Sequence, residues 1–284
     1  MREARSRDVV DTVNTVARGS RGMGALALVL IALTVIYNSV QAQRGRAGAG
    51  AAPTTAKQQA PIDLTGYWVS VITEDWRYRM ITAPKGDHPG LPLSAEGTRV
   101  ANAWDPAKDE AAGDQCKAYG AVGVMRAPGR LHVTWGSDDQ LKVETEAGTQ
   151  ARLFGFGAAA SVTSGAPGTS TAATWQGTSV AQWEVAGARG RGRGGTPQGG
   201  SLKVVTTHMK PGYLLKNGVP YGENAVLTEY FTRTTEPNGD SWLIVTHIVE
   251  DPQYLSQPLI RSSQFKKLPD SASTSWAPEA CSAR

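Results

Sequence analysis

Four histidines are the first residues to consider for chemistry, because imidazole acts both as a general acid–base and as a metal ligand. They lie far apart, at positions 88, 132, 208 and 247, and form no His-x-His or His-Glu-x-x-His pattern. The chain also has no Gly-x-Ser-x-Gly elbow, no Walker A loop and no strand–Gly-x-Gly-x-x-Gly–helix unit. We therefore expect no metal site and no cofactor, and the sequence assigns no catalytic residue.

The densest polar and aromatic cluster is Glu74-Asp-Trp-Arg-Tyr-Arg-Met80. As a strand, this segment would place Trp76 and Tyr78 on one face and Arg77 and Arg79 on the other. Two arginines that point into a cavity would bind a carboxylate or a phosphate of a ligand. Two arginines on the outside would keep an edge strand soluble, and we favour this second arrangement.

A second candidate for chemistry is Glu229, which is opposite in phase to Tyr230 within the segment 226–233. A buried carboxylate beside His247 would perform acid–base chemistry with a shifted pKa. His247 lies in another predicted strand, as does His208. The sequence does not say whether Glu229 and His247 are neighbours.

The elements that must position these residues are strands, because many segments alternate apolar and polar residues with period 2. Asn238-Gly239 signals a tight turn between two of them. The segments are 66–72, 76–81, 131–135, 141–145, 150–156, 175–184, 202–208, 226–233, 242–249 and 259–267. Their regular spacing predicts an all-β fold, an antiparallel barrel of about 8–10 strands formed by residues 61–284.

One short helix is predicted after Ser94, a good N-cap, with Glu96 in its first turn and Asp105-Pro106 at its end. Two inserts, 157–173 and 185–200, are rich in small residues and are expected to be mobile. The second contains an Arg-Gly tract, and tracts of this kind bind RNA in some cytoplasmic proteins. Between two strands of an exported domain we interpret it as a solvated loop.

The N-terminal residues 1–42 have the features of an export signal. An uncharged apolar run, 25–37, follows Arg18 and Arg21, and small residues at Val40 and Ala42 suit a cleavage site. Cleavage after Ala42 would make this a signal peptide, whereas an uncleaved hydrophobic helix of residues 23–42 would anchor the chain in the membrane. Residues 43–60 resemble a flexible linker.

The only two cysteines, Cys116 and Cys281, both follow the export signal. In an oxidising compartment such a pair favours a disulfide, and two unrelated thiols are the alternative. The localisation we expect is periplasmic or secreted, with an inner-membrane anchor if residues 23–42 are retained. The net charge of +4 is too small to indicate nucleic-acid binding.

The chain resembles a large group of secreted, mostly uncharacterised bacterial lipocalin-like barrel proteins. The opening Gly66-Tyr-Trp68 resembles the Gly-x-Trp of lipocalin-like barrels. The order of the other similar stretches supports this resemblance over residues 62–283. These stretches are 103–107, 124–128, 176–184, 202–206, 227–233 and 248–252. The resemblance implies a fold but no particular activity.

Three functions follow from this interpretation. The first is an exported or tethered binding module with a small, partly apolar ligand, and the second is a structural or adaptor subunit with an envelope protein partner. The third is a barrel enzyme, an isomerase or hydrolase, although we lean against an enzyme. The candidate ligand-binding residues are Trp68, Trp76, Arg77, Arg79, Trp135, Trp183, Tyr230 and His247.

Overall fold

The computed structural model describes residues 54–159, 172–185 and 199–284. The predicted export signal, most of the predicted linker and the central parts of both predicted inserts lie outside these ranges. Within them, no helix combines the length and the apolar character that a membrane crossing requires. The description below concerns this part of the chain alone.

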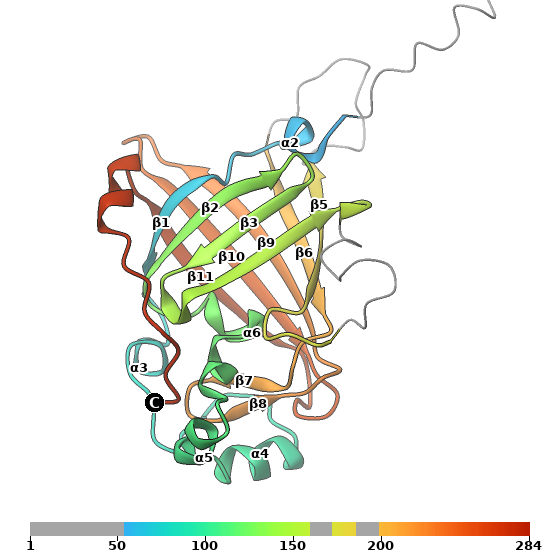
Figure 1. Cartoon of the computed structure of the whole chain (residues 1–284), viewed down its shortest axis with the longest axis vertical. Coiled ribbons are helices and arrows are strands. Elements are labelled where there is room, and N and C mark those ends of the chain that lie inside the picture. Colours follow the sequence, from blue (N-terminus) through green and yellow to red (C-terminus); the bar gives the residue numbers. More distant parts are fainter. Residues whose placement is uncertain (1–53, 160–171, 186–198) are drawn as a thin grey trace, which may run out of the picture. The chain divides into compact units, whose positions relative to one another are not determined.

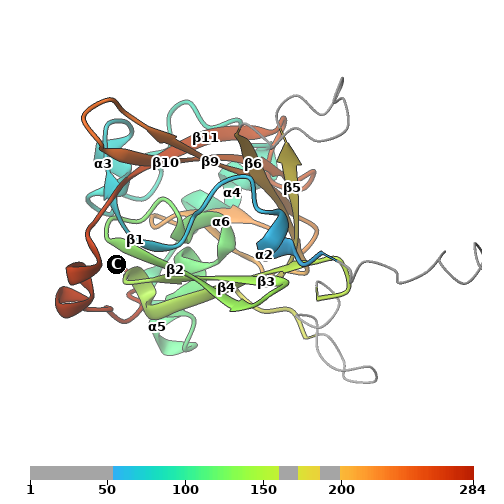
Figure 2. The ribbon, with the colours of Figure 1, turned by 90° about the horizontal axis from the view of Figure 1, so that it is seen from above.

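Nine strands close into a barrel in the order β1-β11-β10-β9-β6-β5-β4-β3-β2 (Figure 1). Strands β2–β4 and β9–β11 lie on opposite sides of the barrel (Figure 2). The barrel strands are β1 (Gly66–Val71), β2 (Arg130–Ser137), β3 (Gln140–Thr145), β4 (Gln150–Phe156), β5 (Thr178–Val185), β6 (Gly200–Thr207), β9 (Val226–Thr235), β10 (Ser241–Glu250) and β11 (Leu259–Lys267). A small hairpin adds β7 (Gly212–Leu215) and β8 (Val219–Tyr221). The prediction of a β-barrel is therefore confirmed.

One pair of neighbours departs from the predicted antiparallel pattern. Strands β4 and β5 are parallel, with Phe154 opposite Ser179 and Phe156 opposite Ala181. Residues 157–177 connect the two strands. A connection of this length is long enough for the chain to turn back before β5 begins. Parallel neighbours require such a crossover, whereas the hairpins elsewhere in the barrel enforce antiparallel pairing.

The segment 76–81, predicted to be a strand, is instead the short helix α3 (Trp76–Arg79) with its C-cap at Met80. Asp75 precedes it in the left-handed region at φ 50°, which Asp tolerates better than most residues. The Asp75 carbonyl accepts hydrogen bonds from the Tyr78 and Arg79 amides. Six residues in which aromatic and charged side chains alternate fit either a strand or a helical turn, so periodicity alone predicted the wrong element here.

The helix predicted after Ser94 is α4 (Ala95–Asn102), and the Ser94 hydroxyl accepts a hydrogen bond from the Gly97 amide. The helix ends at Asn102, with its C-cap at Ala103, shortly before the predicted stop at Asp105-Pro106, and those two residues instead begin α5 (Pro106–Ala111). Asp105 caps α5 by accepting from the Ala107 amide, and Pro106 stands in its first turn. The predicted single helix is therefore corrected to several short ones. The others are η1 (Gln115–Tyr119), α6 (Ala121–Val124), η2 (Ala147–Thr149) and η3 (Asp270–Ser275).

One mouth of the barrel is covered by α2 (Ala56–Gln59), within the segment predicted to be a linker (Figure 1). The Ala56 amide donates to the Asp139 carboxylate at 2.6 Å, and the Ala56 carbonyl accepts from the indole of Trp183 at 2.8 Å. Ala56 is buried in the same apolar cluster as the barrel side chains. Residues 54–60 are thus part of the barrel structure.

Inside the barrel, two apolar clusters are separated by a polar layer. Along β9 the inward residues are Leu227, Glu229 and Phe231, of which Leu227 belongs to one cluster and Phe231 to the other. Along β10, Val249 and Val245 bracket His247 in the same way. The cluster nearer α2 also includes Trp68, and the other includes residues of α6 and of the β7–β8 hairpin at the opposite mouth. The interior is therefore filled with side chains.

Candidate functional site

A buried ion pair is the centre of the polar layer in the barrel. Arg152 on β4 and Glu229 on β9 both have fully buried side chains. The guanidinium donates to both carboxylate oxygens, at 2.9 and 2.5 Å, and its Nη2 also donates to Thr206 Oγ1 at 3.3 Å. A two-point arrangement of this kind is the strongest form of carboxylate recognition by arginine. The two charges compensate each other inside the barrel.

His247 is directly opposite Glu229 in the register of β9 and β10. Its Nδ1 lies 3.2 Å from Glu229 Oε1, and its Nε2 lies 3.2 Å from the Ser263 hydroxyl on β11. Sequence analysis left open whether these two residues are neighbours, and the structure places them in contact. Tertiary packing alone brings Arg152 to the same point.

The pKa values of this layer follow from burial and charge. Burial opposes ionisation of Glu229, but Arg152, with help from His247, outweighs it and lowers the pKa of Glu229 to about 2. Burial lowers the pKa of His247, and the nearby Glu229 carboxylate only partly offsets this effect. At neutral pH the layer therefore holds a carboxylate, a guanidinium and a neutral imidazole.

Ser263, His247 and Glu229 stand in the order of a nucleophile, a general base and an orienting carboxylate. Two features oppose catalysis at this point. The Ser263 and Glu229 side chains are fully buried, and both oxygens of Glu229 already accept from Arg152. The arrangement fits a structural polar layer at least as well as a reactive one.

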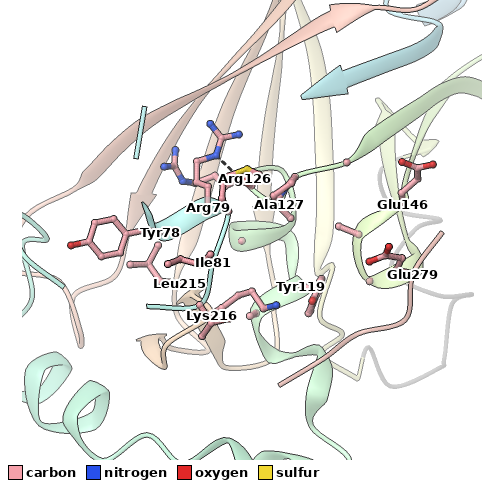
Figure 3. A pocket seen from close by; sticks show the side chains of 18 of the residues that line it. Tyr78, Arg79, Ile81, Tyr119, Arg126, Ala127, Glu146, Leu215, Lys216 and Glu279 are labelled. Carbon is pink, nitrogen blue, oxygen red and sulfur yellow. Dashed lines mark hydrogen bonds between the residues drawn. The ribbon is translucent and has the colours of Figure 1, made fainter. Parts of the chain in front are cut away.

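The larger cleft of the described residues lies elsewhere, at the mouth of the barrel opposite α2 (Figure 3). It has a volume of about 380 Å³. Its walls come from α3 and the following residues to Thr82, from η1 and α6, from the β3–β4 turn, from β7, and from the C-terminal tail. No single stretch of sequence contributes more than a few of its residues.

Arg79 is the wall residue with the most unusual environment. The side chain is 5% exposed. Its Nε donates to the Arg126 carbonyl at 2.9 Å, but Nη1 and Nη2 are buried and have no hydrogen-bond partner among the described residues. Burial, reinforced by the charge of Arg126, lowers the pKa of Arg79 to about 10. Buried polar atoms are nearly always paired, so this guanidinium requires an explanation.

The charges around Arg79 do not balance. Asp75 Oδ2 accepts from Arg126 at 2.7 Å and lies 3.4 Å from Arg261 Nε, so two guanidinium groups share this carboxylate. Glu74 is close enough to raise the pKa of Arg79, and it accepts a hydrogen bond from the Ser262 hydroxyl at 3.4 Å. Three arginines and two carboxylates leave a net positive charge at this end of the cleft.

The opposite end of the cleft is acidic, with Glu146 and Glu279 well separated from the two arginines (Figure 3). Glu146 is already engaged, since it forms an ion pair with Arg130 at 2.5 Å and accepts from the Ala277 amide at 2.9 Å. The lining also includes apolar side chains, among them Met80, Ile81 and Leu215, and Ile81 and Leu215 lie on the arginine side of the cleft (Figure 3). The cleft is therefore polarised along its length.

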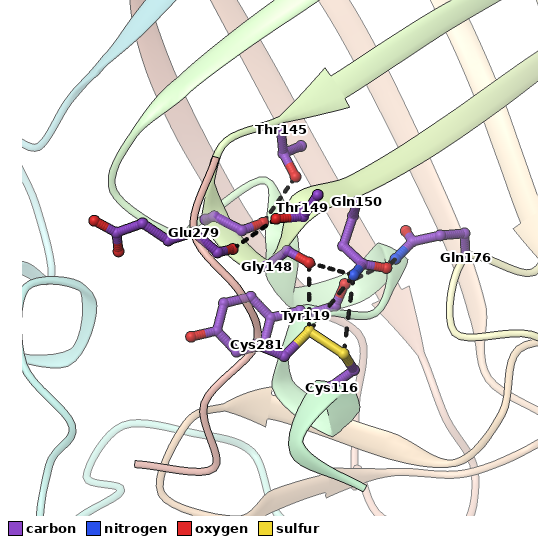
Figure 4. Close-up of a disulfide and its surroundings, with 10 residues drawn as sticks. Cys116, Tyr119, Thr145, Gly148, Thr149, Gln150, Gln176, Glu279 and Cys281 are labelled. Carbon is purple, nitrogen blue, oxygen red and sulfur yellow. Dashed lines mark hydrogen bonds between the residues drawn. A yellow bond between two sulfur atoms is a disulfide. The ribbon is translucent and has the colours of Figure 1, made fainter. Parts of the chain in front are cut away.

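The predicted disulfide between Cys116 and Cys281 is present and positions the tail as one wall of the cleft (Figure 4). Gly148 at φ 72° packs against the Tyr119 ring, where a Cβ would come within 2.5 Å of it. The Thr149 hydroxyl donates to the Glu279 carbonyl at 2.9 Å, and the Glu279 amide donates to the Glu146 carbonyl at 2.8 Å. The tail is thus tied to the β3–β4 turn just before the bridge.

A smaller cleft of about 40 Å³ shares Tyr78, Arg126, Leu214 and Leu215 with the larger one. Its remaining lining includes His247, so it adjoins the polar layer of the barrel. Its volume is far below the roughly 300–1,000 Å³ of small-molecule sites. It does not provide a site for an organic ligand.

The predicted ligand-binding residues do not form one site. Trp68 is fully buried and donates to the Leu64 carbonyl, while Trp135 and Trp183 pack around Phe156 at centroid distances of 5.9 and 5.4 Å. The other five are distributed over the surface and the two clefts. Tyr230 is half-buried on the outward face of β9, Trp76 and Arg77 are exposed, Arg79 lines the larger cleft, and His247 lines the smaller one.

The favoured outward arrangement of the two arginines is correct for Arg77, which forms an ion pair with Asp87 at the surface, and wrong for Arg79. A helical turn sends residues two positions apart to different sides, whereas a strand would have kept them together. Sequence analysis missed Arg126, Leu214 and Leu215, which carry no periodic signal. Within the described residues, no group of three or more His, Cys, Asp or Glu side chains is placed to hold a metal.

No family model, curated protein or solved structure matches this chain. The fold itself defines it as a closed nine-stranded β-barrel protein, and this architecture is compatible with a lipocalin-like barrel.

Proposed function

We propose that this chain is an exported β-barrel protein that binds a small, partly apolar ligand in the cleft opposite α2. The observation that carries the proposal is the cleft of about 380 Å³, which is within the range of small-molecule sites. The barrel interior does not offer such a site, because two apolar clusters and the Arg152–Glu229 layer occupy it.

The assignment to secreted lipocalin-like proteins is part of this proposal. It is supported by the closed barrel and by the Gly66-Tyr67-Trp68 opening, with Trp68 buried in the core. The Cys116–Cys281 disulfide supports export to an oxidising compartment. The proposed ligand site excludes Trp183, one of the ligand-binding residues predicted from sequence, because α2 covers the other mouth of the barrel and the Trp183 indole donates to the Ala56 carbonyl of α2.

A cleft-filling variant tests the proposal. Ala280 lines the cleft, so Ala280→Trp should block it, whereas Ala111→Trp on α5 places the same exposed side chain outside the lining residues. We expect a panel of small charged and neutral amphiphiles to include ligands that raise the melting temperature of the wild type and of A111W. Ligand at a hundred times its Kd should stabilise the fold by about 2.7 kcal/mol. Stabilisation of A280W to the same extent, or of none of the three proteins, would refute the cleft as the site.

The specific observation that favours a second function, a hydrolase, is the contact chain Ser263–His247–Glu229. A serine nucleophile activated in this way should react with a fluorophosphonate probe at Ser263. We expect no labelling, because the hydroxyl is buried and Glu229 is held by Arg152. Labelling that disappears in Ser263→Ala would instead establish the enzyme.

A further inference from the structure

We propose that the ligand of the larger cleft carries a carboxylate or phosphate group, which Arg79 binds, and an apolar part that lies over Met80 and Ile81. This inference rests on the proposed function, since it names the chemical class of ligand for that site. The observation behind it is that the Arg79 guanidinium is buried and oriented, while its Nη1 and Nη2 atoms have no hydrogen-bond acceptor among the described residues.

The geometry of Arg79 suits a two-point contact with an anion. The Nε–Arg126 carbonyl bond fixes the plane of the guanidinium, and the backbone at this point belongs to α3. Nη1 and Nη2 therefore remain as donors with a set orientation. Carboxylates and phosphates present two oxygens at a spacing that matches paired guanidinium N–H groups.

The charge distribution calls for an anion rather than a neutral acceptor. Asp75 Oδ2 is shared by Arg126 and Arg261, and neither Nη1 nor Nη2 of Arg79 forms a hydrogen bond with a carboxylate among the described residues. Burying an unpaired charge costs several kcal/mol unless a counter-charge is supplied. An anionic ligand would supply this counter-charge. Together with the two carboxylates, Glu74 and Asp75, it would balance the three arginines at this end of the cleft.

The acidic end of the cleft fixes the direction in which such a ligand lies. Glu146 is paired with Arg130, but Glu279 would repel an anionic group there, and it lies far from Arg79 in Figure 3. The ligand anion is therefore directed to the arginine end. The ligand also needs an apolar part, because apolar side chains, including Ile81 and Leu215, line the cleft on the arginine side (Figure 3).

The apolar part of the ligand has an exposed apolar surface to cover. Met80 and Ile81 line the cleft and are 56% and 57% exposed. They follow Arg79 directly in the chain, all three residues line the cleft, and Ile81 lies on the same side of it as Arg79 (Figure 3). Exposed apolar side chains that cluster at a cleft are typical of binding sites. An amphipathic anion matches both features.

The test compares ligands that share an alkyl chain and differ in the head group: octanoate, octyl phosphate and octanol, with inorganic phosphate as the head group alone. Binding to the full exported protein is measured by isothermal titration calorimetry. We expect octanoate or octyl phosphate to bind the wild type roughly ten- to a hundredfold more tightly than octanol. A preference for octyl phosphate together with binding of inorganic phosphate would identify a phosphate site, whereas octanoate alone would identify a carboxylate site.

The variant Arg79→Met keeps the length of the side chain and removes the charge. It should reduce the affinity for the anionic amphiphile to that for octanol and leave octanol binding unchanged. The matched control is Arg77→Met on the same helix, whose guanidinium pairs with Asp87 at the surface and should not affect either ligand. If R79M does not fold, the octanoate–octanol comparison in the wild type still decides the question.

Failure of this inference can be told from failure of the proposed function. Equal affinity for octanol and the anions, abolished by A280W, would keep the cleft as the site and refute the anion contact. Anion binding that R79M does not weaken would also refute it. If no amphiphile binds, both proposals fall.

Discussion

Arg152 and Glu229 are a pair of opposite charges with no exposed surface, held between two apolar clusters. Removing both charges from water is costly. This cost is offset by the bidentate contact between Arg152 and Glu229 and by the further hydrogen bond that the guanidinium donates to Thr206 Oγ1. His247 extends the layer to Ser263 on the next strand. These residues link β4, β6, β9, β10 and β11, so their pairing helps to specify how the barrel closes.

Removing one partner of the Arg152–Glu229 pair should lower the stability of the fold far more than replacing both partners with apolar residues. Arg152→Met leaves the Glu229 charge buried and unpaired, and we expect a loss of about 3–5 kcal/mol in the free energy of unfolding. The double variant R152M/E229L removes both charges and should recover much of that loss. Urea denaturation measures both.

The surface pair Lys142–Glu144, at 2.7 Å and about one-third exposed, provides the control. Lys142→Met should change the stability by less than about 1 kcal/mol. An effect of Arg152→Met no larger than that of K142M would show that the buried pair is not needed for stability.

Acid should destabilise the protein through this layer in two steps. His247 has a lowered pKa when folded, so the unfolded chain binds its proton first as the pH falls below 6.5, the ordinary value. Glu229 has its pKa lowered from 4.5 to about 2, so its stabilisation is complete above 4.5 and is lost between these values. Unfolding free energies measured from pH 8 to pH 3 should therefore fall in two steps, one below pH 6.5 and one below pH 4.5. The variant His247→Gln should lack the part of the slope nearest pH 6.5, and an unchanged slope would contradict the assignment.

At the scale of elements, the cleft is assembled from short pieces rather than from the long strands. α3, η1, α6 and the β3–β4 turn each contribute a few residues, and the tail completes the wall. The tail is held by its bridge to η1 and by hydrogen bonds to Glu146 and Thr149. The position of Ala277, Glu279 and Ala280 therefore depends on the disulfide.

Reduction of the disulfide should weaken both the fold and the cleft. The chain-entropy model gives a ceiling of about 5 kcal/mol for a loop of this length, since the two cysteines are separated by 165 positions in the sequence. We expect dithiothreitol to lower the melting temperature and to reduce ligand affinity, because one wall is no longer tied in place. In Cys116→Ser/Cys281→Ser the reductant should have no further effect. Unchanged binding after complete reduction would show that the tail is not part of the site.

At the scale of the whole molecule, closure of the barrel removes the exposed strand edges that an open sheet would present for aggregation. The compact unit begins at Thr54. Export by the preceding residues remains a prediction from sequence, and it is consistent with the disulfide found in the folded part.

The export prediction has a direct test. N-terminal sequencing of the protein from the periplasm or the medium should give a chain that begins after Ala42. A mature chain that still carries Met23 would show that residues 23–42 are retained as an anchor. Deletion of residues 1–42 should keep the protein in the cytoplasm, where Cys116 and Cys281 stay reduced.

The sequence by itself determined the elements whose residues alternate strictly. β10 and β11 lie within one residue of their predicted bounds, because a strand with one buried face has a side-chain period of two. The Ser94 cap and the Cys116–Cys281 bridge were also predictable, since an N-cap is a local signal and the chain holds only one possible cysteine pair.

Only the tertiary structure decided where the charges go. A six-residue segment does not distinguish the α3 turn from a strand, so the sequence could not tell that Arg79 is buried while Arg77 is exposed. The partner of Glu229 is 77 residues away on β4, and the cleft joins segments from Tyr78 to Ala280. Contacts of this kind depend on how the barrel closes, and local patterns carry no information about distant partners.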